Sequence, residues 1–544
     1  MKRWFNQVSL GFKNSRDLFE FARGFRKVRS NHPPAAPGAK RILFVGSGGL
    51  GRTQIELCFM ESLLRERTAV SVLTWPKPHL VKILGLQPAV KVRFWHEFLG
   101  EISEERLGAA WATVGGIWDF IGLEIDGIRI GLHAINSAIR AENRGSFDLE
   151  NPADRETLNG YLRIAMQAAE ASRKILDELR PDVIYFGDYG YNLAGSLFDQ
   201  ARQRSIKIVG QWFSHKSDCL VFKNIAPDNP DADAGAVGDE MWRRLKATEW
   251  DEARSHRLRD ELDASYRRGE WFNMVSKTVR LADQNSEPFI RELGLDSSRK
   301  TAVIFCPMLT DSPLYYGRSL FSSYEEWMIA TVGEAVRNPE LNWILKLHPG
   351  NLSAMDGVNK YGDSLELAAL SRHFPELPAH IRVIRSDASC PAALLYRSID
   401  YVITPRGTAG IEGALAGRAV VTAGTGRYDG KGFTFDSDSV EQYLGLLSDL
   451  QNRSLPGDAE RVLAEKCAAG LFLLKPVGFA SLQIAQRGDF ACTFAVRLRV
   501  RTRETFGRCP DLRKLNRWIL EGETEDLEGD PGFAPAEKVS LSPA

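Results

Sequence analysis

The chain has 544 residues, 44% of them hydrophobic, which is long enough for two domains of roughly 200 residues, each with its own core. Its 70 Lys and Arg balance 70 Asp and Glu, so the net charge gives no indication that the protein binds nucleic acid or an acidic substrate. The seven cysteines form no CxxC pair and no metal-ligand spacing, which indicates buried thiols in a reducing compartment. No apolar run approaches the roughly 20 residues that span a bilayer, and the N-terminus lacks a signal-peptide core. We therefore expect a cytoplasmic protein.

Residues 1–39 stand apart, because they hold eight Lys or Arg against Asp17 and Glu20, interleaved with aromatic residues. Such a segment could lie on an anionic membrane, where each basic residue contributes about 1 kcal/mol, which would place the protein peripherally on the inner face of the cell membrane. The alternative is a helix packed on the body of the protein. A Pro-rich linker follows at residues 33–38.

The first domain, residues 40–226, opens with an apolar strand at 41–45 and a glycine loop, and a helix follows to about residue 67. Gly48, Gly49 and Gly51 would let the backbone approach a ligand at the helix N-terminus. The loop is a poor dinucleotide fingerprint, because no acidic residue follows the next strand at 70–74.

A second strand–helix–strand unit covers residues 182–210, after a largely helical stretch. Asp188 and His215 follow its strand ends, where a carboxylate can act as a general base and a histidine as acid, base or phosphate donor. The alternatives are that Asp188 caps the next helix and that His215 is an ordinary loop residue.

Strands and helices also alternate in the second domain, which indicates a second parallel sheet. Between 495 and 503, apolar and basic residues alternate, as in a half-buried strand with one cationic face. The acidic and then Pro-rich end should be disordered. The segments expected after the first domain are a helical bridge at 227–300, the second domain at 301–455, a C-terminal extension at 456–520 and a disordered tail at 521–544.

Residues 341–436 place polar groups at the ends of successive strands, where ligands of open α/β sheets bind. Lys346 and His348 alternate with leucines on one strand and so point the same way. Thr408 would lie at a helix N-terminus, which favours phosphate oxygens. Glu412, one turn later, could accept from ribose hydroxyls or form a capping arrangement with Thr408.

These residues resemble the GT-B glycosyltransferases of bacterial capsule and surface-polysaccharide synthesis, including relatives that handle Kdo, over about residues 290–450. The resemblance implies an α/β fold of the GT-B type, with two Rossmann-like domains whose parallel sheets face a central cleft. It is carried by Thr310-Asp311-Ser312, segment 321–327, Lys346-Leu347-His348-Pro349, Thr408-Ala409-Gly410-Ile411-Glu412 and segment 427–434.

The resemblance implies that His348 and Thr408 hold the donor phosphate, that Glu412 meets the ribose, and that segment 428–434 closes the donor pocket. It also implies a catalytic base from the N-terminal domain. Gly407-Thr408, preceded by Arg406, replaces a Ser-Thr pair common in the family, and the added cation could favour a diphosphate donor over a CMP-sugar. The donor-binding residues expected are Lys346, His348, Arg406, Gly407, Thr408, Gly410, Glu412, Tyr428, Lys431 and Thr434. The catalytic candidates are Asp188, His215 and Asp311.

The function expected is transfer of a sugar from a nucleotide-activated donor to a growing surface polysaccharide or lipid-linked saccharide, by a hexosyl- or Kdo/sialyl-like transferase. Lys346, His348, Arg406 and the helix dipole would stabilise the departing phosphate, so no metal and no cofactor is expected. The partners are the nucleotide-sugar and a glycan or lipid-linked acceptor, not nucleic acid. The alternatives are a nucleotide-sugar epimerase, a polyol-phosphate transferase, or a non-catalytic scaffold of a polysaccharide-export assembly.

Overall fold

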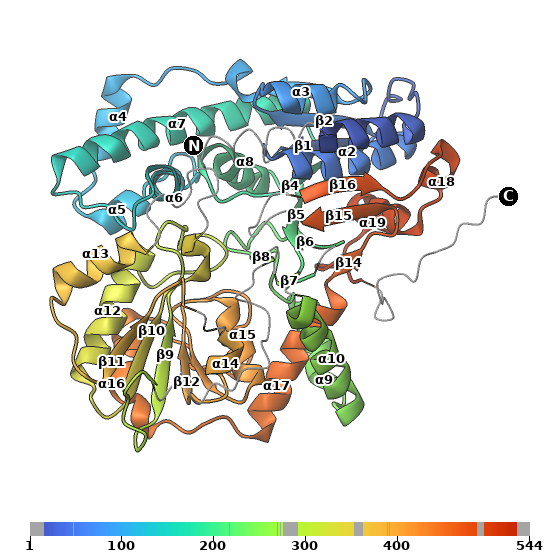
Figure 1. The fold of residues 1–544 in the computed structure, drawn as a ribbon. Helices are drawn as coiled ribbons and strands as arrows, with labels where there is room; N and C mark the ends of the chain where they lie inside the picture. Colours follow the sequence, from blue (N-terminus) through green and yellow to red (C-terminus); the bar gives the residue numbers. More distant parts are fainter. Residues whose placement is uncertain are drawn as a thin grey trace.

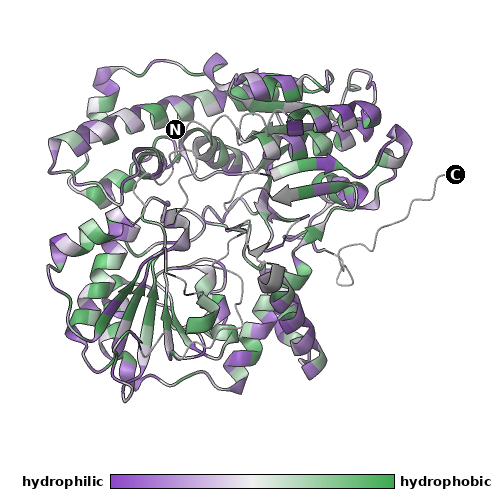
Figure 2. Cartoon of the chain, viewed as in Figure 1, coloured by the Kyte–Doolittle hydropathy of each residue, from purple (hydrophilic) through white to green (hydrophobic). Residues whose placement is uncertain are grey.

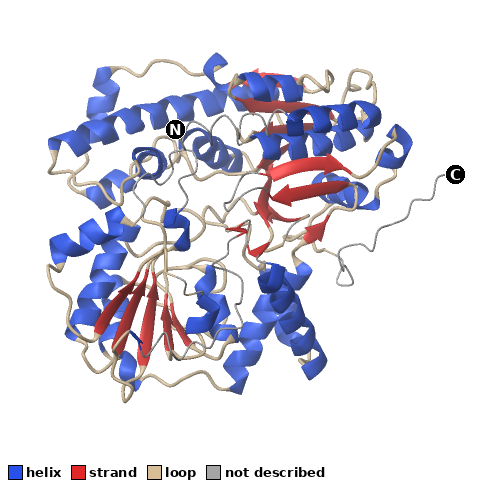
Figure 3. Cartoon of the chain, viewed as in Figure 1, coloured by secondary structure: helices blue, strands red, loops and turns tan. Residues whose placement is uncertain are grey.

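The protein folds into two α/β domains, one above the other in Figure 1. The computed structural model describes residues 16–46, 48–216, 218–268, 270–271, 274–275, 292–352, 363–388, 390, 392–486 and 494–529. Each domain has a central sheet flanked by helices (Figure 3). No helix in the described part of the chain is both long and apolar enough to cross a membrane.

The N-terminal domain is built on a seven-stranded sheet of order β14-β6-β5-β4-β1-β2-β3. Its first five strands in sequence are parallel, whereas β6 pairs antiparallel with β5, and the edge strand β14 pairs antiparallel with β6. The strands are β1 (Arg41–Val45), β2 (Ala69–Thr74), β3 (Lys91–Phe94), β4 (Val183–Phe186), β5 (Lys207–Phe213), β6 (Cys219–Ile225) and β14 (Val477–Gly478). Strands β3 and β6 were not predicted from the sequence.

Helices connect these strands, as parallel pairing requires. They are α2 (Leu50–Arg65), α3 (Pro78–Leu84), α4 (Glu104–Trp111), α5 (Ile117–Ile121), α6 (Ile130–Glu142), α7 (Pro152–Leu179) and α8 (Asn192–Gln203). Two more, α9 (Asp239–Ala247) and α10 (Glu252–Arg268), lead toward the second domain.

The C-terminal domain has a five-stranded, all-parallel sheet of order β11-β10-β9-β12-β13. Its buried strands appear green in Figure 2, as expected for a sheet covered on both faces. The strands are β9 (Thr301–Phe305), β10 (Asn342–Lys346), β11 (Ile381–Ile384), β12 (Tyr401–Ile403) and β13 (Ala419–Val421). The helices are α12 (Tyr324–Arg337), α13 (Ser364–His373), α14 (Ala392–Leu395), α15 (Thr408–Leu415), α16 (Val440–Ser448) and α17 (Asp458–Ala469).

Both sheets share one strand order, in which the first parallel strand lies between the second and the fourth. The order reverses between β1 and β4 in one domain and between β9 and β12 in the other. Ligands of doubly wound sheets bind at such reversal points, beyond the carboxyl ends of the strands. The two Rossmann-like domains of the GT-B arrangement are therefore confirmed.

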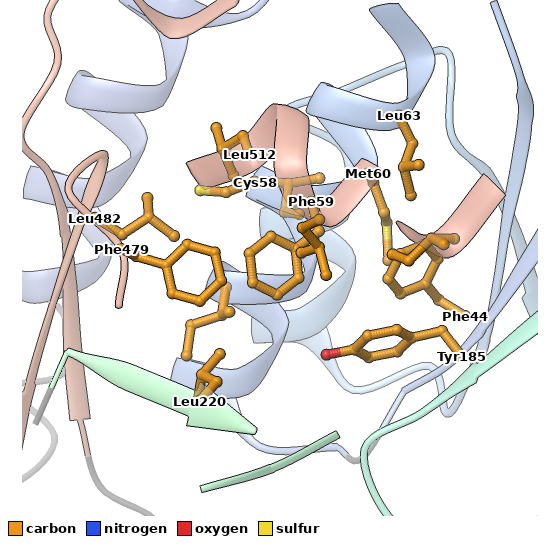
Figure 4. Close-up of a cluster of buried hydrophobic side chains, with 14 of the residues drawn as sticks. Phe44, Cys58, Phe59, Met60, Leu63, Tyr185, Leu220, Phe479, Leu482 and Leu512 are labelled. Atoms are coloured by element: carbon orange, nitrogen blue, oxygen red, sulfur yellow. The ribbon is translucent and has the colours of Figure 1, made fainter. Parts of the chain in front are cut away.

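The C-terminal extension completes the N-terminal domain. After α17, β14 pairs antiparallel with β6, and β15 (Leu482–Gln486) forms a hairpin with β16 (Phe494–Leu498). Helices α18 (Arg503–Gly507) and α19 (Pro510–Glu521) then pack against α2. Figure 4 shows Phe479, Leu482 and Leu512 from this extension in one core with Phe44 and Phe59. The half-buried strand expected from the alternating pattern is β16.

The prediction of disorder from residue 521 is wrong for residues 521–529. Asp526 is 6% exposed and lies 3.3 Å from the ammonium of Lys223, and it also pairs with the buried Lys475. Burial raises the pKa of Asp526, but the two lysines outweigh it and hold that pKa below its ordinary value. The rest of the expected disordered tail, 530–544, lies outside the described residues.

Residues 16–28 form a helix that places Phe21, Phe25 and Val28 in the core of the N-terminal domain. For this part of the N-terminal segment, the alternative of a helix packed on the body is therefore confirmed. Residues 1–15, which carry the rest of the membrane hypothesis, lie outside the described residues.

Candidate active site

A cavity of about 560 Å³ separates the two domains and is lined by residues of both. On the C-terminal side its wall is made by the segments that follow β9, β10 and β12, including Lys346, His348 and Thr408. On the N-terminal side it includes Asp188, from the segment that follows β4, and Trp212, near the end of β5. The cavity thus lies where the topology of the two sheets predicts a ligand.

Lys346 and His348 lie side by side in this wall, as the sequence predicted. Lys346 ends β10 and is 6% exposed, and burial lowers the pKa of its ammonium. The Gly350 N–H donates to His348 Nδ1 at 2.9 Å. In the neutral ring Nδ1 is then the acceptor, so the proton is on Nε2 and available to donate. Burial also lowers the pKa of His348, although Asp311 opposes that shift.

Helix α15 begins at the cavity, and its N-cap is Gly407, which has no capping side chain. The Gly407 N–H itself donates to Thr404 Oγ1 at 3.2 Å. The first N–H groups of any helix lack intrahelical acceptors, and they favour an anion. The capping arrangement between Thr408 and Glu412 that the sequence left open is not formed.

Glu412 lines the cavity one turn into α15, where Tyr266 of α10 donates a hydrogen bond to its Oε2 at 2.7 Å. Because this bond fixes the position of the carboxylate without removing its capacity to accept further hydrogen bonds, the pair can receive hydroxyl groups. Tyr266 was not anticipated, because nothing in its charged helical surroundings distinguishes it.

Arg406 lines the cavity and also holds a neighbouring loop. Its guanidinium donates to the carbonyl oxygens of Pro313 and Tyr315 at 2.8 and 2.7 Å, and to that of Gly317 at 3.3 Å. These bonds hold the loop after β9 against the N-terminus of α15. Arg406 lines the cavity, but much of its donor capacity serves this loop.

Tyr428 and Gly410 shape the start of α15 rather than lining the cavity. The Tyr428 hydroxyl donates to the Gly407 carbonyl oxygen at 2.6 Å, and its ring is 1% exposed against Gly410. Lys431 and Thr434 also lie outside the cavity wall: the Lys431 ammonium lies 5.3 Å from the ring of Trp242, and Thr434 donates to Asp436 at 2.7 Å. From this loop, Arg427 lines the cavity.

Of the three catalytic candidates, Asp188 and Asp311 line the cavity and His215 does not. Asp188 accepts from the Tyr316 hydroxyl at 2.8 Å, across the domain interface. Asp311 pairs with Arg140 of α6 at 2.6 Å, also across the interface.

His215 is 1% exposed, and its Nε2 lies 2.9 Å from Glu261 Oε1. Burial raises the pKa of Glu261, but hydrogen bonding from His215 and the charge of Lys216 outweigh it and lower that pKa to about 2. His215 lies outside this cavity, beside a smaller pocket that Thr408 and Arg427 also line, and its catalytic role stays a prediction.

The glycine loop, with Gly48, Gly49 and Gly51, opens α2 but does not line the cavity. Arg52, in the first turn of α2, does line it, and its guanidinium lies 4.6 Å from the centroid of the Phe213 ring.

The loop after β9 carries residues that the sequence analysis missed. Tyr315 is 3% exposed and its hydroxyl contacts Nδ1 of His133, whose Nε2 lies 2.9 Å from Asp199. Two adjacent tyrosines in a long polar loop are the signal that could have identified this contact between domains.

Comparison with known proteins gives one family match, over residues 240–446, to the family described as capsule polysaccharide biosynthesis protein. A search of curated proteins finds no match. Similar solved structures include KpsC of Thermosulfurimonas dismutans, a β-Kdo 2,4 transferase, at 14% identity over 55% of this chain and 82% of that chain, with a TM-score of 0.33.

Two further solved structures match over a larger share of this chain, again at low sequence identity. HepE of Anabaena, in complex with UDP and glucose, is 13% identical over 88% of this chain and 98% of that one, with a TM-score of 0.28. A glycosyltransferase of Rickettsia africae is 9% identical over 89% and 99%, with a TM-score of 0.26. At these values the likenesses assign no activity. The family match agrees with the resemblance drawn from the sequence: residues 240–446 match the model of the family described as capsule polysaccharide biosynthesis protein.

Proposed function

We propose that the protein transfers a glycosyl group from a nucleotide-activated sugar to a saccharide acceptor during capsule or related surface-polysaccharide synthesis. The observation that carries the proposal is the cavity between the domains. One wall gathers Lys346, His348 and the N-terminus of α15, and the opposite wall presents Asp188.

The donor side can stabilise a departing nucleotide phosphate. When the bond from the anomeric carbon to the phosphate oxygen breaks, negative charge develops on that oxygen. The Lys346 ammonium, the His348 Nε2–H and the N–H groups at Thr408 supply positive potential in a partly desolvated site, where such groups are most effective. Glu412, held by Tyr266, would accept hydrogen bonds from the ribose hydroxyls. That no metal is needed remains a prediction.

On the acceptor side, Asp188 is the candidate general base. It would take the proton from an acceptor hydroxyl as that oxygen bonds to the anomeric carbon. Tyr316 orients the carboxylate through its 2.8 Å hydrogen bond. Asp311 is the weaker candidate, because its carboxylate is already paired with Arg140.

The test measures nucleotide release from nucleotide-sugars, with and without a capsule-oligosaccharide acceptor. A transferase releases nucleotide when acceptor is present, whereas an epimerase converts the nucleotide-sugar alone. Asp188→Asn should reduce turnover about 10²–10⁴-fold, the usual contribution of a general base, with donor binding retained. Asp438→Asn, at an exposed position of the same domain pair, is the control. Full turnover by Asp188→Asn would refute the assigned base, and acceptor-independent conversion would refute transfer.

The scaffold alternative predicts a different outcome in cells. If Asp188→Asn, Asp311→Asn and His348→Ala all leave polymer synthesis intact, the chain does not act as an enzyme.

A further inference from the structure

Two segments that pack on the N-terminal domain carry an excess of positive charge. Residues 494–521 hold eight Lys or Arg against three Asp or Glu, and residues 16–30 hold five against two. The chain as a whole carries 70 of each sign. The remainder of the chain is therefore net negative.

The two basic segments lie together in the structure. A Cβ on Gly24 of the N-terminal helix would lie 3.3 Å from Leu498 of β16, and Arg497 pairs with Glu20 at 2.9 Å. Helix α19 packs on α2, where Asn516 Nδ2 donates to Ser62 Oγ at 2.8 Å. Figure 1 shows β16, α18 and α19 in red beside the blue α2.

We call the exposed cations of these elements the basic face. They come from the helix at 16–28, from β16 and the residues after it, and from α18 and α19. Its members are Arg23, Arg26, Lys27, Arg497, Arg499, Arg501, Arg503, Arg508, Arg513, Lys514 and Arg517.

Helix α19 explains how the face forms. Its Leu512, Leu515 and Ile519 are buried in the core, so the helical period turns the intervening cations outward. Arg508, Arg513, Lys514 and Arg517 line an open groove of about 630 Å³, together with Trp518 and Glu521.

We propose that the basic face docks the protein on an anionic phospholipid bilayer. Two observations favour a bilayer over a soluble polyanion. The cations are spread over several elements as a broad surface, and Phe19, 66% exposed, lies on the same side of its helix as Arg23 and Arg26. Cations surrounding an exposed aromatic ring are typical of interfacial membrane binding.

The sequence before this helix has the same composition. The first 15 residues contain Lys2, Arg3 and Lys13 with Trp4 and Phe5, and the chain continues from them directly into the basic face. This surface is independent of the candidate active site, so the proposal does not rest on the proposed function.

The experiment is co-sedimentation of the full-length protein with phosphatidylcholine vesicles, with and without phosphatidylglycerol, at low and high salt. We expect binding that requires phosphatidylglycerol and weakens with salt, because screening acts on exposed charges. Arg513→Ala, Lys514→Ala and Arg517→Ala together should weaken it on the order of 100-fold, since each cation contributes a similar increment.

The matched control neutralises three exposed cations of the C-terminal domain, Arg337, Arg397 and Arg461, with the same change of net charge. It should bind as the wild type does, and thermal unfolding verifies that both variants fold. Unchanged binding of the α19 variant would overturn the proposal. So would loss of all binding on deletion of residues 1–15 alone, or binding to dextran sulfate but not to vesicles.

Discussion

Gly410→Ala tests how the start of α15 is built. A Cβ at this position would lie 1.9 Å from the Tyr428 hydroxyl oxygen and 2.6 Å from its Cζ, far inside contact distance. The buried Tyr428 ring must therefore move, and its hydrogen bond to the Gly407 carbonyl must break. Strain of about 1–3 kcal/mol and a lost hydrogen bond of about 1 kcal/mol are partly offset by about 1 kcal/mol of helix propensity. The expected net loss in unfolding free energy is about 1–3 kcal/mol.

A double-mutant cycle isolates this contact. In a Tyr428→Ala background the obstacle is gone, so Gly410→Ala should cost nothing or stabilise slightly. The assay is urea unfolding followed by tryptophan fluorescence. The variants can be compared if the unfolding free energy falls with urea concentration at the same slope in each. An equal loss in both backgrounds would refute the reasoning.

Three further predictions concern buried contacts. Asp526→Asn leaves Lys475 buried without its counter-ion and should lower the free energy of unfolding in urea by about 3–5 kcal/mol. A loss below about 1 kcal/mol would contradict this prediction. The pKa of Asp526 in the folded protein lies below the ordinary value of about 4, so the carboxylate stabilises the fold fully above about pH 4. The difference in unfolding free energy between the wild type and Asp526→Asn should vanish as the pH falls through the folded pKa. In Arg406→Lys the ammonium cannot donate to all three carbonyl oxygens of the loop after β9, so the KM for the donor should rise. An unchanged KM would show that these hydrogen bonds do not matter for donor binding. Tyr315→Phe removes the partner of His133 Nδ1 and should lower the free energy of unfolding by about 1–3 kcal/mol, and with it the thermal midpoint. An unchanged midpoint would show that the contact contributes nothing.

The strands around the site were predictable because their signal is local. The apolar runs that became β1, β9, β10 and β12 end in turn residues, and their alternation with helices determines a parallel sheet. Lys346 and Thr408 could be placed because Lys346 ends one predicted strand and Thr408 begins the helix after another.

The parts that were missed depend on distant partners. Nothing local in β14 indicates that it pairs with β6, and the polar composition around Asp526 gives no hint of the buried lysines that hold it. The carbonyl oxygens that Arg406 contacts lie on a separate loop, so the sequence could not show this contact. The contact between His215 and Glu261 was missed for the same reason, since Glu261 belongs to α10.

The most direct test of the account is nucleotide binding at the cavity. A thermal-shift series with CMP, UDP, GDP and CDP should show one base that stabilises the protein, by about 2.7 kcal/mol at 100 times its Kd. His348→Ala should abolish that shift, and His373→Ala, at an exposed position of the same domain, should leave it intact. No shift with any nucleotide, or a full shift in His348→Ala, would contradict the assignment of this cavity as the donor site.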